Sequence, residues 1–171
     1  MVRLIFAFVD IMLHRRGPDI LPSSPFFVWL LLAVSIVVEL GVLAFNGATP
    51  RALGVSVLVT FLNIWFVWGL LRTFNRERRF RQTMSALFGA EIILNIVGAP
   101  LVPLVELPET GDPELTWPLF LTLLIGVWSL DITAFVFAKA LERPYFLCVA
   151  IIVGYALLML SLQTALLAPA A

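Results

Sequence analysis

The chain has little charge and little of the chemistry on which enzymes and metal sites depend. Only 13% of its 171 residues are charged, and it contains one cysteine, Cys148, and one histidine, His14. This pair cannot build a disulfide, a zinc site, a haem site or a Ser/His/Asp triad. We therefore expect no enzymatic activity, no metal and no cofactor. The one catalytic arrangement left open is an aspartyl-type pair of Glu91 with Asp131.

The composition instead indicates a protein that dissolves in lipid. Hydrophobic residues make up 61% of the chain, and the mean hydropathy is +1.05. Both values are outside the range of soluble domains. The net charge is zero, so the uniformly basic surface typical of nucleic-acid binding is absent. Ten of the eleven basic residues are arginine, which is typical of GC-rich bacterial genomes, and we expect a bacterial inner-membrane protein without a nucleic-acid partner.

Five windows of the sequence have the length needed to cross a bilayer, which is about 20 apolar residues in a helix. Turn-forming or charged residues separate them, such as Asn46 to Pro50 and Glu142 to Pro144. The sequence therefore predicts an all-α fold, a polytopic transmembrane helix bundle over residues 26–171. The five predicted spans are 26–45, 52–71, 83–105, 118–138 and 145–167.

The positions of lysine and arginine predict the orientation of this bundle. Short cytoplasmic loops retain basic residues, and with the N-terminus inside only Arg51 falls on the external side. The acidic connection from Glu106 to Trp117 then lies outside, as does the C-terminus. The cytoplasmic side receives the other ten basic residues: Arg3, Arg15, Arg16, Arg72, Arg76, Arg78, Arg79, Arg81, Lys139 and Arg143.

The first 25 residues form a separate element with a Pro-rich entry into the first span. The segment from Met1 to Leu13 is almost entirely apolar but too short to cross a bilayer, and the residues Arg15 to Pro18 end it. Arg3, Asp10 and His14 form one narrow polar stripe on a helix. We therefore predict a short amphipathic helix in the cytoplasmic headgroup layer. A signal peptide fits poorly, because the charge pair follows the apolar run and no cleavage site comes after it.

This layout of five spans, short loops, a cytoplasmic N-terminus and an external C-terminus resembles the Yip1 family of membrane proteins. The stretch Arg15 to Pro22 also resembles a phrase found in short, uncharacterised inner-membrane proteins of bacteria. The Asp-Leu-Tyr-Gly-Pro motif of eukaryotic Yip1 proteins is absent, so no residue role is carried over. The resemblance implies a small membrane-organising or trafficking-type protein that acts through partners.

Three acidic residues, Glu39, Glu91 and Asp131, fall inside predicted spans. Each costs about 2.5 to 3.5 kcal/mol at the centre of an inserted helix unless it finds a partner or water. At about 1.5 Å per residue, Glu91 and Asp131 lie roughly 10 to 12 Å above the cytoplasmic edge, and Asn63 reaches nearly the same level. Asn95 shares the helix face of Glu91. These residues predict an intramembrane polar layer of Asn63, Glu91, Asn95 and Asp131, with Glu39 as a second acid nearer the outside.

Two roles fit such a layer. It could handle protons or ions, with Glu91 and Asp131 titrating, or it could be a clamp in which protonated carboxyls hydrogen-bond neighbouring helices. No span contains lysine or arginine, so we expect a neutral acid or a water-filled pocket rather than an ion pair. The clamp is the favoured interpretation.

The third predicted span has two further features. Gly98-Ala99-Pro100 and Pro103 predict a kink in its outer half, because proline lacks the backbone donor of a helix. In its inner half, Ser85, Ala86, Gly89 and Ala90 form a small-residue face on which another helix could pack closely, either within the chain or from a partner.

The loop between the second and third spans is strongly basic and adjoins the membrane on both sides. Its arginines could serve only to orient the protein, or they could recruit anionic lipid headgroups or an acidic partner at about 1 kcal/mol each. We expect a membrane accessory or scaffolding protein that binds lipid and other membrane proteins or itself. A small proton- or ion-coupled carrier or channel subunit is the alternative, and an intramembrane enzyme is third. The loop arginines are Arg72, Arg76, Arg78, Arg79 and Arg81.

Overall fold

The computed structural model describes residues 2–105 and 116–167, and within these ranges the chain is helical and contains no strand, which confirms the predicted all-α class. Three 3-10 turns join the α-helices: η1 (Pro18–Ile20), η2 (Glu77–Arg79) and η3 (Val102–Leu104). The α-helices are α1 (Val2–Met12), α2 (Pro25–Phe45), α3 (Pro50–Thr73), α4 (Phe80–Gly98), α5 (Trp117–Leu141) and α6 (Tyr145–Leu167).

Proline marks the start of most of the long helices. Pro25 and Pro50 are the first residues of α2 and α3, where the missing backbone N–H costs no hydrogen bond and the fixed φ suits the helix. Thr49, just before α3, accepts a hydrogen bond from the backbone N–H of Ala52 at 3.3 Å. At the C-terminal end of α5, Glu142 adopts a left-handed conformation (φ 54°), and the chain turns directly into α6.

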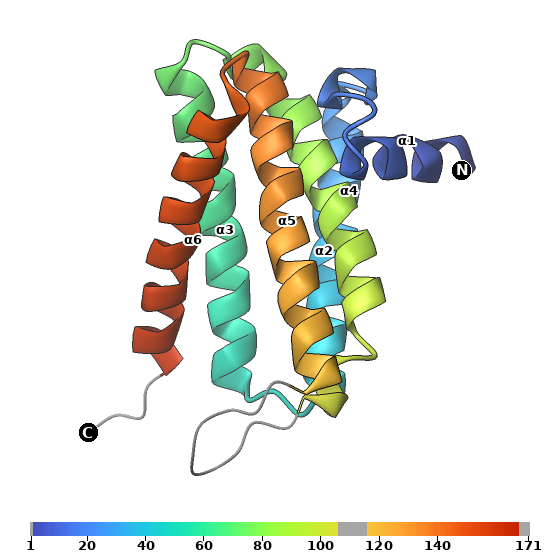
Figure 1. The fold of residues 1–171 in the computed structure, drawn as a ribbon, viewed down its shortest axis with the longest axis vertical. Helices are drawn as coiled ribbons and strands as arrows, with labels where there is room; N and C mark the ends of the chain where they lie inside the picture. The colour runs from blue at the N-terminus through green and yellow to red at the C-terminus, as the bar shows by residue number, and fades with distance from the viewer. Residues whose placement is uncertain (1, 106–115, 168–171) are drawn as a thin grey trace.

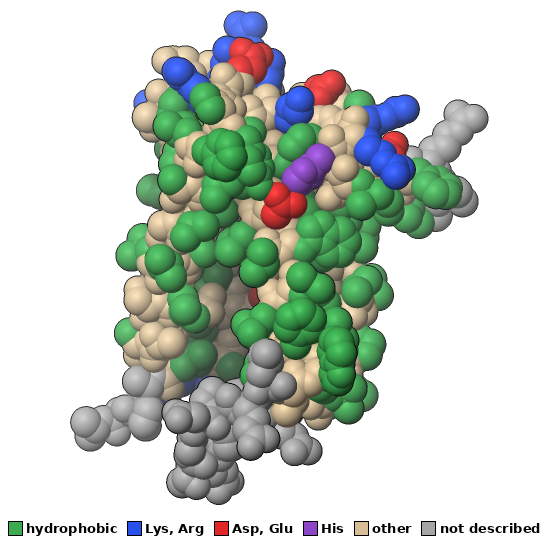
Figure 2. All heavy atoms as spheres, viewed as in Figure 1, with side chains coloured by type: hydrophobic (Ala, Val, Ile, Leu, Met, Phe, Trp, Pro, Cys, Tyr) green, Lys and Arg blue, Asp and Glu red, His purple; other side chains and the backbone are tan. Residues whose placement is uncertain are grey.

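The five long helices run alternately up and down, side by side (Figure 1). The α3–α4 and α5–α6 connections therefore lie at one end with α1, and Figure 2 shows Lys and Arg side chains gathered there. Arg51, at the start of α3, lies at the opposite end. The acidic residues of the predicted external loop (Glu106, Glu109, Asp112 and Glu114) and the four C-terminal residues are outside the described ranges.

Four helices, α2, α3, α5 and α6, are long and apolar enough to cross a membrane, whereas five spans were predicted. The fifth, α4, is shortened at its C-terminal end: it stops at Gly98 instead of continuing to Val105, because Pro100 cannot donate to the carbonyl of Ile96. Its sequence is also more polar, since it carries Arg81, Gln82, Glu91 and Asn95. Most of its apolar and small residues are buried against other helices rather than exposed on the bundle surface.

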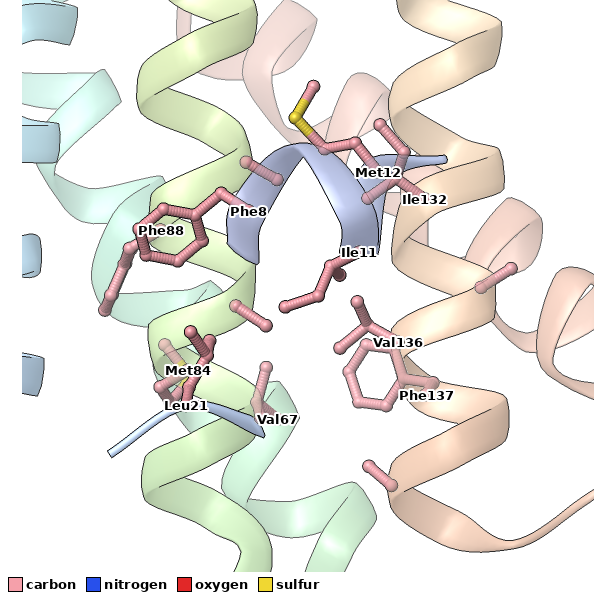
Figure 3. Close-up of a cluster of buried hydrophobic side chains, with 14 of the residues drawn as sticks. Phe8, Ile11, Met12, Leu21, Val67, Met84, Phe88, Ile132, Val136 and Phe137 are labelled. Atoms are coloured by element: carbon pink, nitrogen blue, oxygen red, sulfur yellow. The ribbon is translucent and has the colours of Figure 1, made fainter. Parts of the chain in front are cut away.

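Helix α1 lies across the bundle near its basic end (Figure 1) and contributes to the hydrophobic core. Phe8, Ile11 and Met12 are buried, and Figure 3 shows them between α4 and α5. The ring of Phe8 lies so close to Gly89 that a Cβ there would be 2.1 Å from the ring. The small-residue face of α4 is therefore occupied within the chain. The core is concentrated at this end of the molecule.

Candidate functional site

Glu91 is half-buried in the middle of the bundle, where α2 and α4 are in contact. The hydroxyl of Ser35, which is fully buried in α2, donates a hydrogen bond of 2.8 Å to its Oε2. A serine one turn from a second acid, Glu39, thus ties the two helices together through the carboxylate. Glu39 itself accepts a long hydrogen bond of 3.4 Å from Thr60, whose hydroxyl also lies 3.1 Å from the carbonyl oxygen of Ser56.

Glu91 lines two cavities. The first, of about 410 Å³, lies among α3, α4, α5 and α6 and also has Asn63 in its wall. There the hydroxyl of Tyr155 donates a 2.6 Å hydrogen bond to Oδ1 of Asn63, and the Tyr155 ring stacks on Phe66 with centroids 3.7 Å apart. The second, of about 330 Å³, lies toward the C-terminal end of α4, and its lining includes Glu39, Glu91 and Asn95. Glu91 is the one predicted site residue that lines both.

Asp131 lies apart from these cavities, on another face of α5. Its Oδ1 accepts a hydrogen bond from the hydroxyl of Tyr145 at the start of α6, and its Oδ2 lies 3.2 Å from Nε2 of His14. The imidazole of His14 stacks on Phe135 with centroids 4.2 Å apart. About a third of each side chain in the His14–Asp131 pair is exposed, so the pair is neither dry nor fully hydrated.

This arrangement differs in two ways from the predicted polar layer, which was expected to contain no basic partner. The four residues of the predicted layer do not face one cavity, since Asn63 and Glu91 meet at one and Asp131 faces elsewhere. Asp131 also has a basic partner, which comes from the N-terminal segment and not from a span. His14 was missed as a site residue because it lies just after α1 in a left-handed conformation (φ 60°), and that turn directs the chain back to the bundle.

The basic loop is divided between residues that hold the fold and residues that remain exposed. Arg76 and Arg79 both bind the carboxylate of Glu142, and Arg79 also donates to the carbonyl oxygen of Lys139 at 2.8 Å. These contacts fix the α3–α4 loop to the α5–α6 connection. Arg78 and Arg81 are exposed, and no ion pair to either is found in the described part of the chain.

Arg72, the remaining loop arginine, lies over the ring of Trp68, 4.9 Å from its centroid. Contact with an aromatic face at the end of α3 suits an arginine at the edge of the hydrocarbon region. Across residues 2–105 and 116–167, no group of three or more His, Cys, Asp or Glu side chains is placed to hold a metal ion. Comparison with known proteins shows no match to a family model, a curated protein or a solved structure.

Proposed function

We propose that the chain is a multi-pass inner-membrane protein that acts as an accessory or scaffolding protein. In this proposal it has five spans, and α4 is the span that the other helices cover. A helix covered by its neighbours needs less apolar surface than one facing lipid, so the polar residues of α4 are compatible with a buried span. In this proposal α1 lies flat in the cytoplasmic headgroup layer, and the topology is the one that the Yip1 family has.

We infer that this role includes binding of anionic lipid headgroups at the basic loop. The observation that supports it is that some loop arginines are held by the fold while others are exposed. Glu142 holds Arg76 and Arg79, so the loop has a fixed position at the end of the bundle. Arg78 and Arg81 are then presented to the surface at the level where headgroups would lie. Orientation of the protein does not require that the loop be held in one position. Binding of anionic headgroups is strengthened when the positions of the binding charges are fixed before the ligand arrives. Acidic segments of membrane-protein partners, or of a second copy, would meet the same surface.

Anionic lipid titration tests this proposal. We expect phosphatidylglycerol, added to purified protein in neutral detergent micelles, to raise the thermal unfolding temperature. Replacing Arg78 and Arg81 by alanine removes about 2 kcal/mol of headgroup attraction, roughly a 30-fold loss in apparent affinity. Arg51→Ala, at the opposite end of the bundle, is the matched control. Equal stabilisation of wild type and the Arg78/Arg81 double variant would refute lipid binding by this loop.

The cavity between Asn63 and Glu91 favours a second candidate, a small proton- or ion-coupled carrier or channel subunit. Proton and cation flux into proteoliposomes separates it from the first. The scaffold proposal predicts no flux above that of protein-free vesicles. Flux in wild type that is abolished by Glu91→Gln, with unchanged thermal stability, would replace the scaffold by the carrier.

A further inference from the structure

The first cavity has the dimensions and the walls of a ligand site. Its volume of about 410 Å³ falls within the range of small-molecule pockets. Figure 2 shows the molecule hollowed on the face between α6 and α5, where this cavity opens. The opening faces sideways out of the bundle. A ligand would therefore enter from the apolar side of the protein, which requires that it have an apolar part.

The charges in the wall are of one sign. Glu91 is the single ionisable acid among the lining residues, and no lysine, arginine or histidine lines the cavity. Ser35 approaches one oxygen, Oε2, from the α2 side. A carboxylate accepts several hydrogen bonds, and the structure shows no other side-chain donor to Glu91 among the described residues. In its ionised form Glu91 would repel an anionic ligand, whereas a ligand that brings a positive charge and N–H donors would pair with that form.

The remaining wall is aromatic and aliphatic. Phe66, stacked on Tyr155, and Phe137 present ring surfaces, and Met84 and Met159 add thioethers that adapt to irregular shapes. Aromatic faces attract organic cations as well as apolar groups. A bare metal ion does not match this wall, because one carboxylate and scattered amide and hydroxyl oxygens would have to replace its whole hydration shell.

We propose that this cavity binds a small amphiphilic organic monocation, with its ammonium group on Glu91 and its apolar body against Phe66, Phe137 and Met84. The hydroxyls of Ser129 and Thr133 and the amide of Gln163 provide further acceptors along the wall for the N–H groups that Glu91 leaves unpaired. Equilibrium binding at this site is separate from headgroup binding at the basic loop. It does not require that the ligand be transported.

Titration with a matched pair of probes tests the site. Phenethylamine and its neutral analogue 2-phenylethanol are added to the protein in nanodiscs, and the heat of binding is measured with empty nanodiscs subtracted. We expect wild type to bind the amine at least tenfold more tightly than the alcohol. Glu91→Gln should abolish this difference, and Glu39→Gln, which changes an acid outside the first cavity, should preserve it.

A second variant keeps the carboxylate and fills the space. Ala156 lines the cavity from α6, and Ala156→Phe should lower amine binding at least tenfold while Glu91 is unchanged. The Arg78/Arg81 double variant should bind the amine like wild type, so failure of the lipid proposal would leave this one intact. Equal affinity of wild type for amine and alcohol, or wild-type amine binding in both Glu91→Gln and Ala156→Phe, would overturn the proposal.

Discussion

Among the individual residues, Glu91 and Ser35 define the polar contact at the centre of the bundle. The serine hydroxyl is fully buried and donates to the glutamate carboxyl at 2.8 Å, its one side-chain partner among the described residues. The carboxyl therefore acts in the fold as an acceptor for one donor. A side-chain amide offers the same acceptor at nearly the same volume, whereas a methyl group leaves the serine without a partner and opens space beside the cavity.

We accordingly predict that Glu91→Gln is mild and Glu91→Ala is not. The glutamine variant should lose less than about 1 kcal/mol of stability, and the alanine variant about 1 to 2 kcal/mol more, within the range of intramembrane hydrogen bonds plus the cavity term. Thermal unfolding in detergent ranks the variants, and Ser35→Ala is the control for the lost contact. A glutamine variant as unstable as the alanine variant would show that the negative charge itself holds the helices.

The contact of His14 with Asp131 gives a second prediction. About a third of each side chain is exposed, so water screens the pair, and we expect a coupling energy of about 0.5 to 1 kcal/mol. Met12 is buried, so a cysteine introduced in its place reacts with a thiol reagent only when α1 leaves the core. Cys148→Ala removes the native cysteine, so that only position 12 is labelled. The labelling rates of His14→Ala, Asp131→Asn and the double variant then close a double-mutant cycle. Strictly additive effects would mean that the two side chains do not interact.

The sequence places residues along a helix better than around it. A rise of about 1.5 Å per residue put Asn63, Glu91 and Asp131 at one level, and Asn63 does share a cavity with Glu91. The rotation of α5 about its own axis depends on what packs against it, and the sequence alone does not give it. Asp131 faces Tyr145 and His14 as a result. The contact of His14 was unpredictable for a similar reason, because a single left-handed residue decides where the N-terminal segment returns.

Among the helices, α1 and α4 show how a small residue positions a whole element. The short apolar segment before the first span was expected from its length and its charged end, and α1 (Val2–Met12) lies there. Its docking into the core was not expected, since nothing in a segment of this length specifies which face of which helix it meets. The notch at Gly89 specifies it, because only a residue without a side chain lets the Phe8 ring approach α4 so closely.

Gly89→Ala should therefore loosen α1. The added Cβ would lie 2.1 Å from the Phe8 ring, which must move, and overpacking of this kind costs about 1 to 3 kcal/mol. The gain in helix propensity from alanine is present whether α1 is docked or not, so it does not offset the loss. We predict labelling of a cysteine at Met12 to accelerate about tenfold or more.

Gly126→Ala in α5 is the control for this substitution, because a Cβ there meets nothing within 4 Å. It should leave labelling at Met12 unchanged. If Gly89→Ala also leaves the labelling rate unchanged, the Phe8 ring is not held in the notch.

Helix α4 shows why a count of spans from hydropathy is incomplete. Lipid-facing helices must be apolar on their outer surface, and α2, α3, α5 and α6 are. A helix surrounded by others is packed through small residues and can carry polar ones, and α4 buries Ser85, Gly89 and Ala90 while holding Glu91 and Asn95. The sequence predicts a span over 83–105, but α4 ends at Gly98, because the apolar residues that follow include Pro100 and Pro103.

For the whole molecule, the up-and-down arrangement gathers most of the basic residues at one end of the bundle. Alternating helices bring the α3–α4 loop, the α5–α6 connection and the N-terminal segment to one end, and ten of the eleven basic residues belong to these segments or to the helix turns that adjoin them. The charge counts of the sequence therefore agree with the arrangement of the helices in space. The proposed cytoplasmic N-terminus rests on this clustering, because short cytoplasmic loops retain basic residues.

The side of the membrane on which the C-terminus lies is the most direct test of the five-span proposal. An odd number of spans places the two termini on opposite sides of the membrane, and an even number places them on the same side. Paired reporter fusions, one active only in the cytoplasm and one active only outside it, are placed after Ala171 and, as an internal reference, after Arg78. We predict external activity at Ala171 and cytoplasmic activity at Arg78. Cytoplasmic activity at both positions would contradict the proposal, because an even number of spans would then follow Arg78 and one of α4, α5 and α6 would not cross.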